Sequence, residues 1–414
     1  KHEAGNLPFV PTSHDFGTDG VAAKCSVCGA PKELERGAGR ENYAYAFIHG
    51  TYPIKEMSDM KFDVIVGNPP YQIGMRDAQG NRTANILPLY QKFVERAIAF
   101  DPRYLVMITP SRWFAGGKGL DEFRDRMIAD RRLRALVDNP KLFDCFPGVE
   151  IKGGISYFLW DRNHDGDCDF SMRIDGKIVS TAARDLRDGD GVVVRDNRAA
   201  SIITKVRSAV RESSLADVVS AMDPFGQVIK TNYKHAKPKP FRGSIPLVFG
   251  SKVEYVRRDQ LERHHEWVDR WKVLIPMASD GHGREISYVI GEPIALAPGS
   301  ACTQTYLVAG VFDTREETEN FAHYLATKFV RFLVLQRKTT QHLRPDKFRF
   351  VPALDMKRRW TDAQLYKKFG LTSEERKYID ASIQPREVIL SMESPVPASH
   401  LLGGSKHRSG EEEE

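Results

Sequence analysis

The segment FDVIVGNPPY, residues 62–71, joins a short β-branched run to a glycine and then to a rigid polar turn. A run of this kind that ends in glycine is typical of a buried parallel strand. In an open α/β sheet, ligands bind beyond the carboxyl ends of such strands, where Asn68-Pro69-Pro70-Tyr71 lies. The two prolines lack backbone donors and restrict the turn. The sequence therefore predicts a loop that presents mainly hydrogen-bond acceptors at a ligand-binding edge.

This loop has the groups needed to hold an exocyclic amino group. Such a group on a nucleobase has two N–H donors and a lone pair that is delocalised into the ring. If the Asn68 side-chain oxygen and the Pro69 carbonyl each accept one hydrogen, the nitrogen is held pyramidal and its lone pair becomes available for attack. Tyr71 provides an aromatic face on which a base can stack. An activated methyl group would then need neither a metal nor a strong base.

The surrounding sequence alternates strands with helices. We expect strands at 103–108, 133–137 and 154–160 and helices at 87–100 and 120–131, which together predict an α/β sheet. A turn-rich stretch follows, then a helix near 199–210, strands at 272–276, 286–291 and 305–310, and a helix at 316–334. The expected organisation is a polar segment (1–60), a catalytic core (61–165), a connector (166–215), a mixed α+β domain (216–383) and an unordered tail (384–414).

FDVIVGNPPYQ resembles the catalytic motif of DNA amino-methyltransferases. The resemblance extends to ILPLYQKFVERAI (86–98), YLVMITPSRWFAGGKGLDEFRD (104–125) and FPGVEIKGGISYFLW (146–160). Together these segments are similar to the restriction-modification methylases of the type IIG-like group. The resemblance implies a partial Rossmann-like methyltransferase sheet followed by a target-recognition domain.

The same resemblance implies transfer of a methyl group from S-adenosylmethionine to adenine in double-stranded DNA. Adenine is expected because the motif begins Asn-Pro-Pro-Tyr, as in the adenine-modifying members, and not with serine. Such enzymes take the base out of the duplex. Tyr157 and Phe158 match the aromatic position that packs on the flipped base, and strand alternation lets only one of them face the pocket.

The glycine-rich loop that binds S-adenosylmethionine in the family has no clear counterpart. Gly37-Ala38-Gly39 follows a polar run, and the glycines at 116–119 lie downstream of the catalytic motif. Asp63 is the candidate for cofactor contact. Because the chain opens at Lys1 with 67 residues before Asn68, we expect the loop to lie upstream in the same polypeptide. The expected partners besides DNA are that upstream part or a restriction partner.

Basic residues gather in two segments of the C-terminal half. The interval 230–272 has eleven basic and five acidic residues, and 328–359 has ten basic and two acidic, with phenylalanines interleaved. This mixture favours DNA binding, although a solvated helix followed by a strand would show the same pattern. The segment 328–352 is also similar to the closing helix and strand of the target-recognition domain. The candidate DNA contacts are Arg112, Lys234, Lys237, Lys239, Arg337, Lys338, Arg344 and Lys347.

The five cysteines are too few and too scattered for a disulfide framework, and no signal peptide or membrane-length apolar run is present. We therefore expect a cytoplasmic protein. Cys25-Ser-Val-Cys28-Gly is half of a zinc knuckle. No second C-x-x-C follows, and His14 or His49 would have to serve at unusual spacing. We therefore expect reduced thiols and no metal site.

Two other interpretations stay open. Methyltransferases of RNA or of protein glutamine also use Asn-Pro-Pro-Tyr, but those enzymes do not need some 200 further residues with basic patches. Alternatively, the chain is the DNA-reading part of a restriction endonuclease whose catalytic sites lie elsewhere. No persuasive metal-binding nuclease motif supports this second interpretation.

Overall fold

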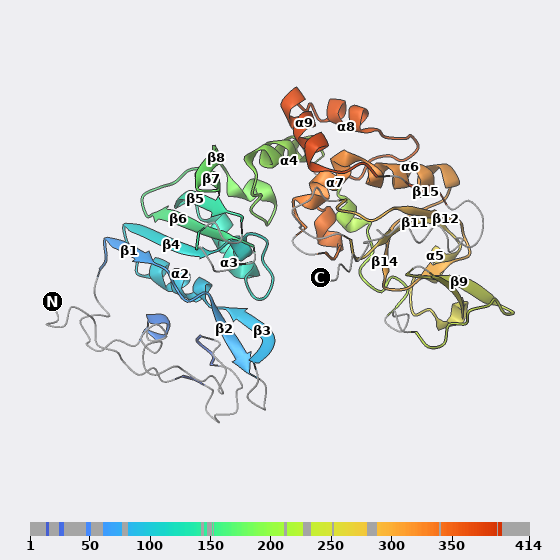
Figure 1. The fold of residues 1–414 in the computed structure, drawn as a ribbon, viewed down its shortest axis with the longest axis horizontal. Helices are drawn as coiled ribbons and strands as arrows, with labels where there is room; N and C mark the ends of the chain where they lie inside the picture. The colour runs from blue at the N-terminus through green and yellow to red at the C-terminus, as the bar shows by residue number, and fades with distance from the viewer. Residues whose placement is uncertain are drawn as a thin grey trace, which may run out of the picture. The chain divides into compact units, whose positions relative to one another are not determined.

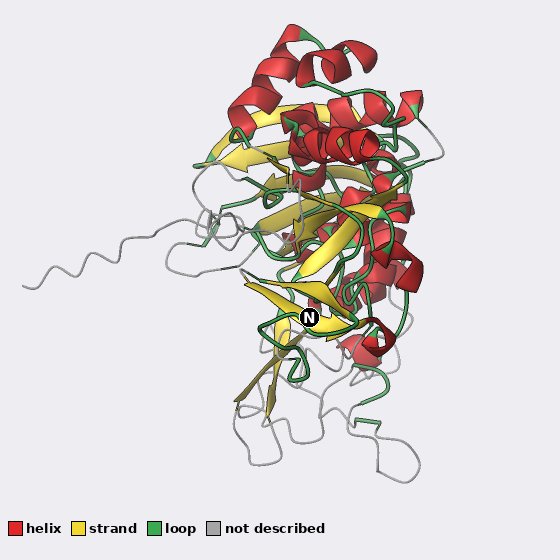
Figure 2. Cartoon of the chain, turned by 90° about the vertical axis from the view of Figure 1, so that its right-hand side faces the viewer, coloured by secondary structure: helices red, strands yellow, loops and turns green. Residues whose placement is uncertain are grey.

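The computed structural model describes the chain in segments. These are residues 14–15, 25–28, 47–50, 61–76, 82–141, 145–146, 151, 153–210, 213–226, 233–250, 252–279, 288–338, 341–386 and 388–390. The chain divides into two compact units, 1–200 and 201–414, and both contain strands and helices (Figure 2). No helix in the described segments is long and apolar enough to span a bilayer.

The first unit is built on a six-stranded mixed sheet, ordered β1-β4-β6-β5-β7-β8 (Figure 1). Strands β1, β4, β5 and β7 run parallel to one another, whereas β6 and β8 run in the opposite direction. The strands are β1 (Val64–Gly67), β4 (Tyr104–Pro110), β5 (Leu133–Asn139), β6 (Ile155–Asp161), β7 (Cys168–Ile174) and β8 (Lys177–Arg184). The expected α/β sheet is confirmed, and it continues past the predicted boundary at 165.

Helices α2 (Tyr90–Ala99) and α3 (Asp121–Ala129) cover one face of this sheet. Apolar residues of both helices are buried with alternate residues of the strands, including Leu105, Phe158 and Trp160. A hairpin of β2 (Gln72–Arg76) and β3 (Arg82–Pro88) leads from the Asn68–Tyr71 loop into α2. The predicted helix 87–100 therefore begins three residues late, because the strand β3 extends to Pro88.

Strand β1 is an edge strand, and the prediction of a buried strand is wrong. Its only ladder among the described residues is with β4. Val64 is 53% exposed and Val66 is 72% exposed, whereas Ile65 packs against the core on the helix side. The β-branched sequence suits a strand covered on both faces, but the described residues cover only one.

The second unit combines two smaller sheets with helices. One sheet is ordered β10-β9-β13 and the other β14-β11-β12-β15. The strands are β9 (Ser244–Phe249), β10 (Lys252–Arg257), β11 (Trp271–Pro276), β12 (Ile294–Leu296), β13 (Ala301–Cys302), β14 (Tyr306–Phe312) and β15 (Ile389–Leu390). The helices are α5 (His265–Val268), α6 (Arg315–Ala326), α7 (Lys328–Leu335), α8 (Asp362–Lys368) and α9 (Ser373–Ser382). Helix α4 (Asn197–Ala209) spans the boundary between the units. This arrangement confirms the predicted α+β part.

Two local predictions in the second unit are wrong. The expected helix 316–334 is two helices, because Thr327 interrupts it: its hydroxyl donates to Tyr324 O at 2.7 Å and caps α7 by accepting from Val330 N. The expected strand 286–291 is not formed in its described part, 288–291, where Val289 has a φ of 66°. Residues 286 and 287 lie outside the described residues.

Candidate active site

The Asn68–Tyr71 loop directly follows the last residue of β1. Gly67 lies against Met107 of β4, where an added Cβ would be 2.8 Å from the methionine sulfur. Asn68 is exposed, Pro69 is buried and Pro70 is exposed. The Asn68 amide makes no hydrogen bond to any residue that the structure describes, so its oxygen is free to accept one from a ligand.

Tyr71 is anchored through its backbone. Its carbonyl oxygen accepts the Leu89 N–H at 3.1 Å, and Leu89 is the buried N-cap of α2. The ring is half-buried, and its hydroxyl has no hydrogen-bond partner among the described residues. Burial raises the pKa of Tyr71 to about 12, and the nearby Cys145 contributes to the rise. Tyr71 therefore stays neutral at physiological pH and is suited to packing against a ligand.

The two aromatic candidates on β6 point to opposite faces of the sheet. Phe158 is 2% exposed and lies in the core with the residues of α2 and α3. It cannot stack on a base, so this half of the prediction is wrong. Tyr157 is partly exposed and pairs with Ile108 and Val137, on the face that α2 and α3 do not cover. Tyr157 remains the candidate.

A buried polar network, which no sequence motif indicated, connects the strand ends on the Asn68 side of the sheet. Asp138, at the end of β5, is fully buried and accepts the Ser111 hydroxyl at 2.8 Å. Arg195 donates to both carboxylate oxygens of Asp138 at 2.7 Å and to Gly153 O at 2.7 Å. Such a bidentate pair fixes geometry as well as charge. The network ties the segment after β4 to the end of β5 and to the approach to β6.

Gly154 completes this connection just before β6. Its carbonyl accepts the Ser111 N–H at 2.9 Å, and its φ is 80°. A Cβ at this position would collide with the Asn139 carbonyl oxygen. Glycine is therefore required where β6 begins, and this requirement sets where Tyr157 enters the sheet.

Among the described residues, the glycines at 116–119 are partly engaged by α3. A Cβ at Gly116 would collide with the Arg124 guanidinium and the Asp121 carboxylate, and the Gly117 N–H donates to Asp121 at 3.1 Å. This glycine segment therefore packs on the first turn of α3. Gly37 to Gly39 lie outside the described residues. Asp63 is exposed just before β1, and its carbonyl accepts the Tyr104 N–H.

The predicted DNA contacts divide into exposed and internal residues. Arg112, Lys234, Lys237, Lys239 and Arg344 are exposed. Arg112 lies near the buried Tyr90, whose pKa is raised by burial despite that positive charge. Arg112 belongs to the first unit, whereas the three lysines and Arg344 belong to the second.

The other three candidates, Arg337, Lys338 and Lys347, are buried or partly buried in the second unit. Lys338 is 3% exposed and donates to the Ser279 hydroxyl at 2.7 Å, so its assignment to DNA is wrong. Lys347 is mostly buried and pairs with Asp346 at 2.7 Å, and the Arg337 guanidinium lies 4.9 Å from the Phe350 ring centroid. The interleaved phenylalanines of this segment are core residues: Phe329, Phe332, Phe348 and Phe350.

Cys25 and Cys28 have two histidines beside them. His14, Cys25, Cys28 and His49 each direct one potential ligand atom to the same place, with all four atoms within 4.8 Å of one another. The expectation that the two cysteines lack further ligands to complete a metal site is therefore wrong. Sequence spacing could not reveal the cluster, because the histidines come from two separate stretches of chain.

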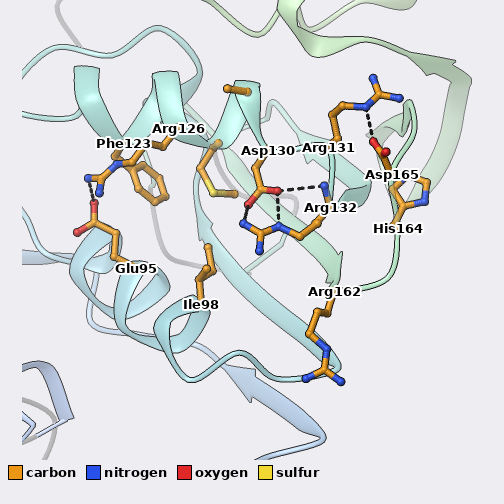
Figure 3. A pocket seen from close by; sticks show the side chains of 12 residues that line it. Glu95, Ile98, Phe123, Arg126, Asp130, Arg131, Arg132, Arg162, His164 and Asp165 are labelled. Atoms are coloured by element: carbon orange, nitrogen blue, oxygen red, sulfur yellow. Dashed lines mark hydrogen bonds and ion pairs between the residues drawn. The ribbon is translucent and has the colours of Figure 1, made fainter.

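A cavity of about 730 Å³ lies at the opposite edge of the first unit's sheet, between the end of α2 and the start of β5 (Figure 3). It contains several arginines, but each is paired with a carboxylate: Arg126 with Glu95, Arg131 with Asp165, Arg132 with Asp130, and Arg162 with Asp101. The cavity is remote from the edge that carries Asn68, and its charges are already balanced.

Comparison with known proteins supports the predicted resemblance. Residues 17–146 match the family model of the Eco57I restriction-modification methylase. Over 189 residues the chain is 33% identical to a protein described as an uncharacterized adenine-specific methylase of Mycoplasma pneumoniae. That alignment covers 44% of this chain and 44% of the relative, so the chain spans less than half of the curated protein it matches. The resemblance to restriction-modification methylases is confirmed.

Solved structures show more distant similarity. The type IIG restriction endonuclease BpuSI superposes with a TM-score of 0.31 and 11% identity, over 78% of this chain and 54% of that chain. The type IIL restriction-modification enzyme MmeI, solved in complex with DNA, gives a TM-score of 0.32 and 9% identity, over 78% and 55%. Both TM-scores are below 0.5 and identify no fold by themselves.

Proposed function

We propose that this chain, which is similar over residues 17–146 to the Eco57I restriction-modification methylases, forms the acceptor-binding part of a site-specific adenine DNA methyltransferase. The observation that carries the proposal is the exposed side-chain amide of Asn68. It makes no hydrogen bond to the described residues, and it lies on a diproline turn at the carboxyl end of β1. A hydrogen-bond acceptor that is already in position suits a ligand group with two N–H donors.

The amino group of adenine is the ligand that fits these acceptors. In this proposal the Asn68 side-chain oxygen accepts one N6 hydrogen and the Pro69 carbonyl accepts the other. The nitrogen lone pair then points away from both acceptors, toward an incoming methyl group. Buried Pro69 and the hydrogen bond from Leu89 to Tyr71 hold the loop still, so little reorganisation is needed when the base arrives.

The base must be flipped to reach this loop, because its amino group is otherwise paired in the duplex. Tyr71 has part of its ring accessible, and Tyr157 lies on the uncovered face of the sheet. Stacking on such rings contributes about 1–3 kcal/mol per base, which offsets part of the free energy of extrusion. We assign the stacking role to these two tyrosines.

S-adenosylmethionine, when bound, would supply the activated methyl group. The described residues do not provide its cradle, so we propose that sequence outside them holds it. The uncovered face and the unpaired edge of β1, with exposed Val64 and Val66, support a sheet that is extended by further structure. No role in cofactor binding is needed from the glycines at 116–119.

The decisive test is base modification by the native polypeptide that contains residues 1–414. It is expressed in a methylation-deficient bacterial host, and modified bases in the genome are mapped by sequencing. We expect N6-methyladenine at one short sequence. Asn68→Ala should reduce modification by at least about 100-fold, because one pre-positioned acceptor is lost.

Asn163→Ala is the matched control, since Asn163 is an exposed asparagine beyond the far end of β6. It should leave modification unchanged. Methylated cytosine, or methylated RNA or protein with unmodified DNA, would overturn the proposal. Full DNA modification by Asn68→Ala would also overturn it.

A further inference from the structure

We propose that His14, Cys25, Cys28 and His49 bind one Zn²⁺ ion in a closed, structural site. The four side chains come from three short described stretches, 14–15, 25–28 and 47–50. Each supplies one potential ligand atom: two thiol sulfurs and two imidazole nitrogens. Two sulfurs and two nitrogens form a common tetrahedral zinc set, and four protein ligands leave no open position for a substrate.

The distances between the ligand atoms agree with such a site. Zinc bonds of about 2.3 Å to sulfur and about 2.0 Å to nitrogen in a tetrahedron place each sulfur about 3.5 Å from each nitrogen. The Cys28 sulfur lies 3.3 Å from His14 Nδ1, and the Cys25 sulfur lies 3.7 Å from His49 Nε2. The two imidazole rings meet edge to face with centroids 5.0 Å apart, so both nitrogens reach one centre without the rings clashing.

The surroundings also fit a zinc knuckle. Cys25 and Cys28 are buried, with 2% and 4% of their surfaces exposed. Ser26 joins the knuckle to the His14 stretch, because its N–H and hydroxyl both donate to Asp15, at 2.9 Å and 2.5 Å.

Among the residues that the structure describes, the apolar core around these cysteines is small. It consists of the two cysteines with Ile48, Leu89 and Phe93, and Phe47 stacks on Phe93 with ring centroids 5.9 Å apart. So few apolar side chains give little free energy with which to hold three separate stretches of chain together. A bound ion would link all three directly, and metal binding would then contribute to folding.

The site also lies next to the substrate loop. Leu89, which shares the apolar cluster with both cysteines, donates its N–H to the Tyr71 carbonyl. A metal held by the four ligands would therefore support the N-terminus of α2 and, through Leu89, the Asn68–Tyr71 loop. This role is structural, and it does not depend on which substrate the enzyme methylates.

The test is the metal content of the full chain, purified without chelator. We expect about one zinc per chain by inductively coupled plasma mass spectrometry. Cobalt exchanged into the site should give the intense visible bands of tetrahedral coordination together with sulfur-to-cobalt charge transfer. Cys28→Ser and His49→Ala should lose both, whereas Cys168→Ser and His164→Gln, which change the same residue types outside the cluster, should keep them.

His49→Cys keeps the test decisive if the deletion variants fail to fold, because it retains four ligands. We expect it to hold about one metal per chain, with stronger charge transfer from a third thiolate. A chain that contains no zinc and takes up no cobalt would overturn the proposal. A cobalt spectrum that is the same in His49→Cys and the parent would also overturn it, as would equal metal loss in Cys168→Ser.

Discussion

Lys272 is a fully buried lysine in the middle of the second unit. It lies on β11, and its ammonium donates to the Val268 carbonyl at 3.4 Å. Burial lowers the pKa of Lys272 to about 8, although the nearby Asp269 carboxylate acts in the opposite direction. Burial also raises the pKa of Cys302 to about 12, so this thiol stays neutral beside the lysine.

The position of Lys272 predicts a dependence of stability on pH. Its pKa in the folded chain, about 8, lies below the ordinary value of 10.5, so the unfolded chain binds more protons between these two values. The free energy of unfolding should therefore rise as the pH increases from about 8 to 10.5. Lys272→Met removes the buried charge and should stabilise the chain at pH 7 by about 1–3 kcal/mol.

The measurement is denaturant unfolding of the parent and Lys272→Met at pH 7, 8, 9 and 10. The stability difference between them should shrink as the pH rises, because the parent lysine becomes neutral in the folded state. Lys367→Met, at an exposed lysine of α8, should show no such convergence. A difference that stays constant across this range would contradict the assignment to Lys272.

Residue patterns predicted the position of the Asn68–Tyr71 loop but not the burial of each candidate side chain. The Asn-Pro-Pro-Tyr turn lies beyond a strand, as the sequence indicated. Strand alternation showed that either Tyr157 or Phe158 faces outward, but the choice depends on which face α2 and α3 cover. Asp138 and Arg195 are far apart in sequence, so no local pattern could reveal their pairing.

At the scale of elements, periodicity predicted strands and helices well where one face is buried in a continuous core. Strands β4, β5 and β6 and helix α3 begin or end within about two residues of the predicted limits. Strands β7 and β8 lie in a stretch rich in turn residues, and their pairing with the sheet depends on partners distant in sequence.

Charge patterns were less reliable than apolar periodicity. Helix α7 combines lysine, arginine and phenylalanine, but its residues from Phe329 to Val334 are buried. Arg331 is 1% exposed and donates to the Ala326 and Thr327 carbonyls near the end of α6. A buried arginine of this kind satisfies helix carbonyls. A basic residue in the sequence therefore does not by itself indicate a surface charge.

The segment 233–240 is the better candidate for phosphate contact. Lys234, Lys237 and Lys239 are all exposed, and the Lys237 backbone pairs with Tyr255 of β10, which fixes the segment to a strand. Changing all three to glutamine should weaken DNA binding and reduce the slope of log K against log salt by about 2–3, if each lysine contacts one phosphate.

The measurement is a salt titration of duplex binding by the full chain. Lys367→Gln with Lys377→Gln is the matched control, because both lysines are exposed but lie outside the two basic segments. This double variant should keep the parent slope. A parent slope near zero, or an unchanged slope in the triple variant, would show that the 233–240 lysines do not contact phosphate.

At the scale of the whole molecule, the described residues cover one face of the first unit's sheet and leave the other uncovered. Alternate residues of β4 and β6 that face away from α2 and α3 are only partly buried, including Val106, Ile108, Tyr157 and Leu159. The valines of β1 on the same face are exposed. Partly exposed valine, isoleucine and leucine side chains on this face are suited to contact with chain outside the described residues.

From the face that the described residues leave uncovered, we predict that the chain alone binds S-adenosylmethionine weakly or not at all. In our proposal the described residues supply hydrogen-bond acceptors for the adenine amino group, but Gly116 is packed against Asp121 and Arg124 of α3, and the Gly117 N–H is already used by Asp121. Calorimetric titration of S-adenosylmethionine into the chain should therefore give no heat beyond dilution. The native polypeptide with a completed sheet should bind it, and the chain should still be folded by circular dichroism. Micromolar binding by the chain alone would show that a cofactor site exists within these 414 residues.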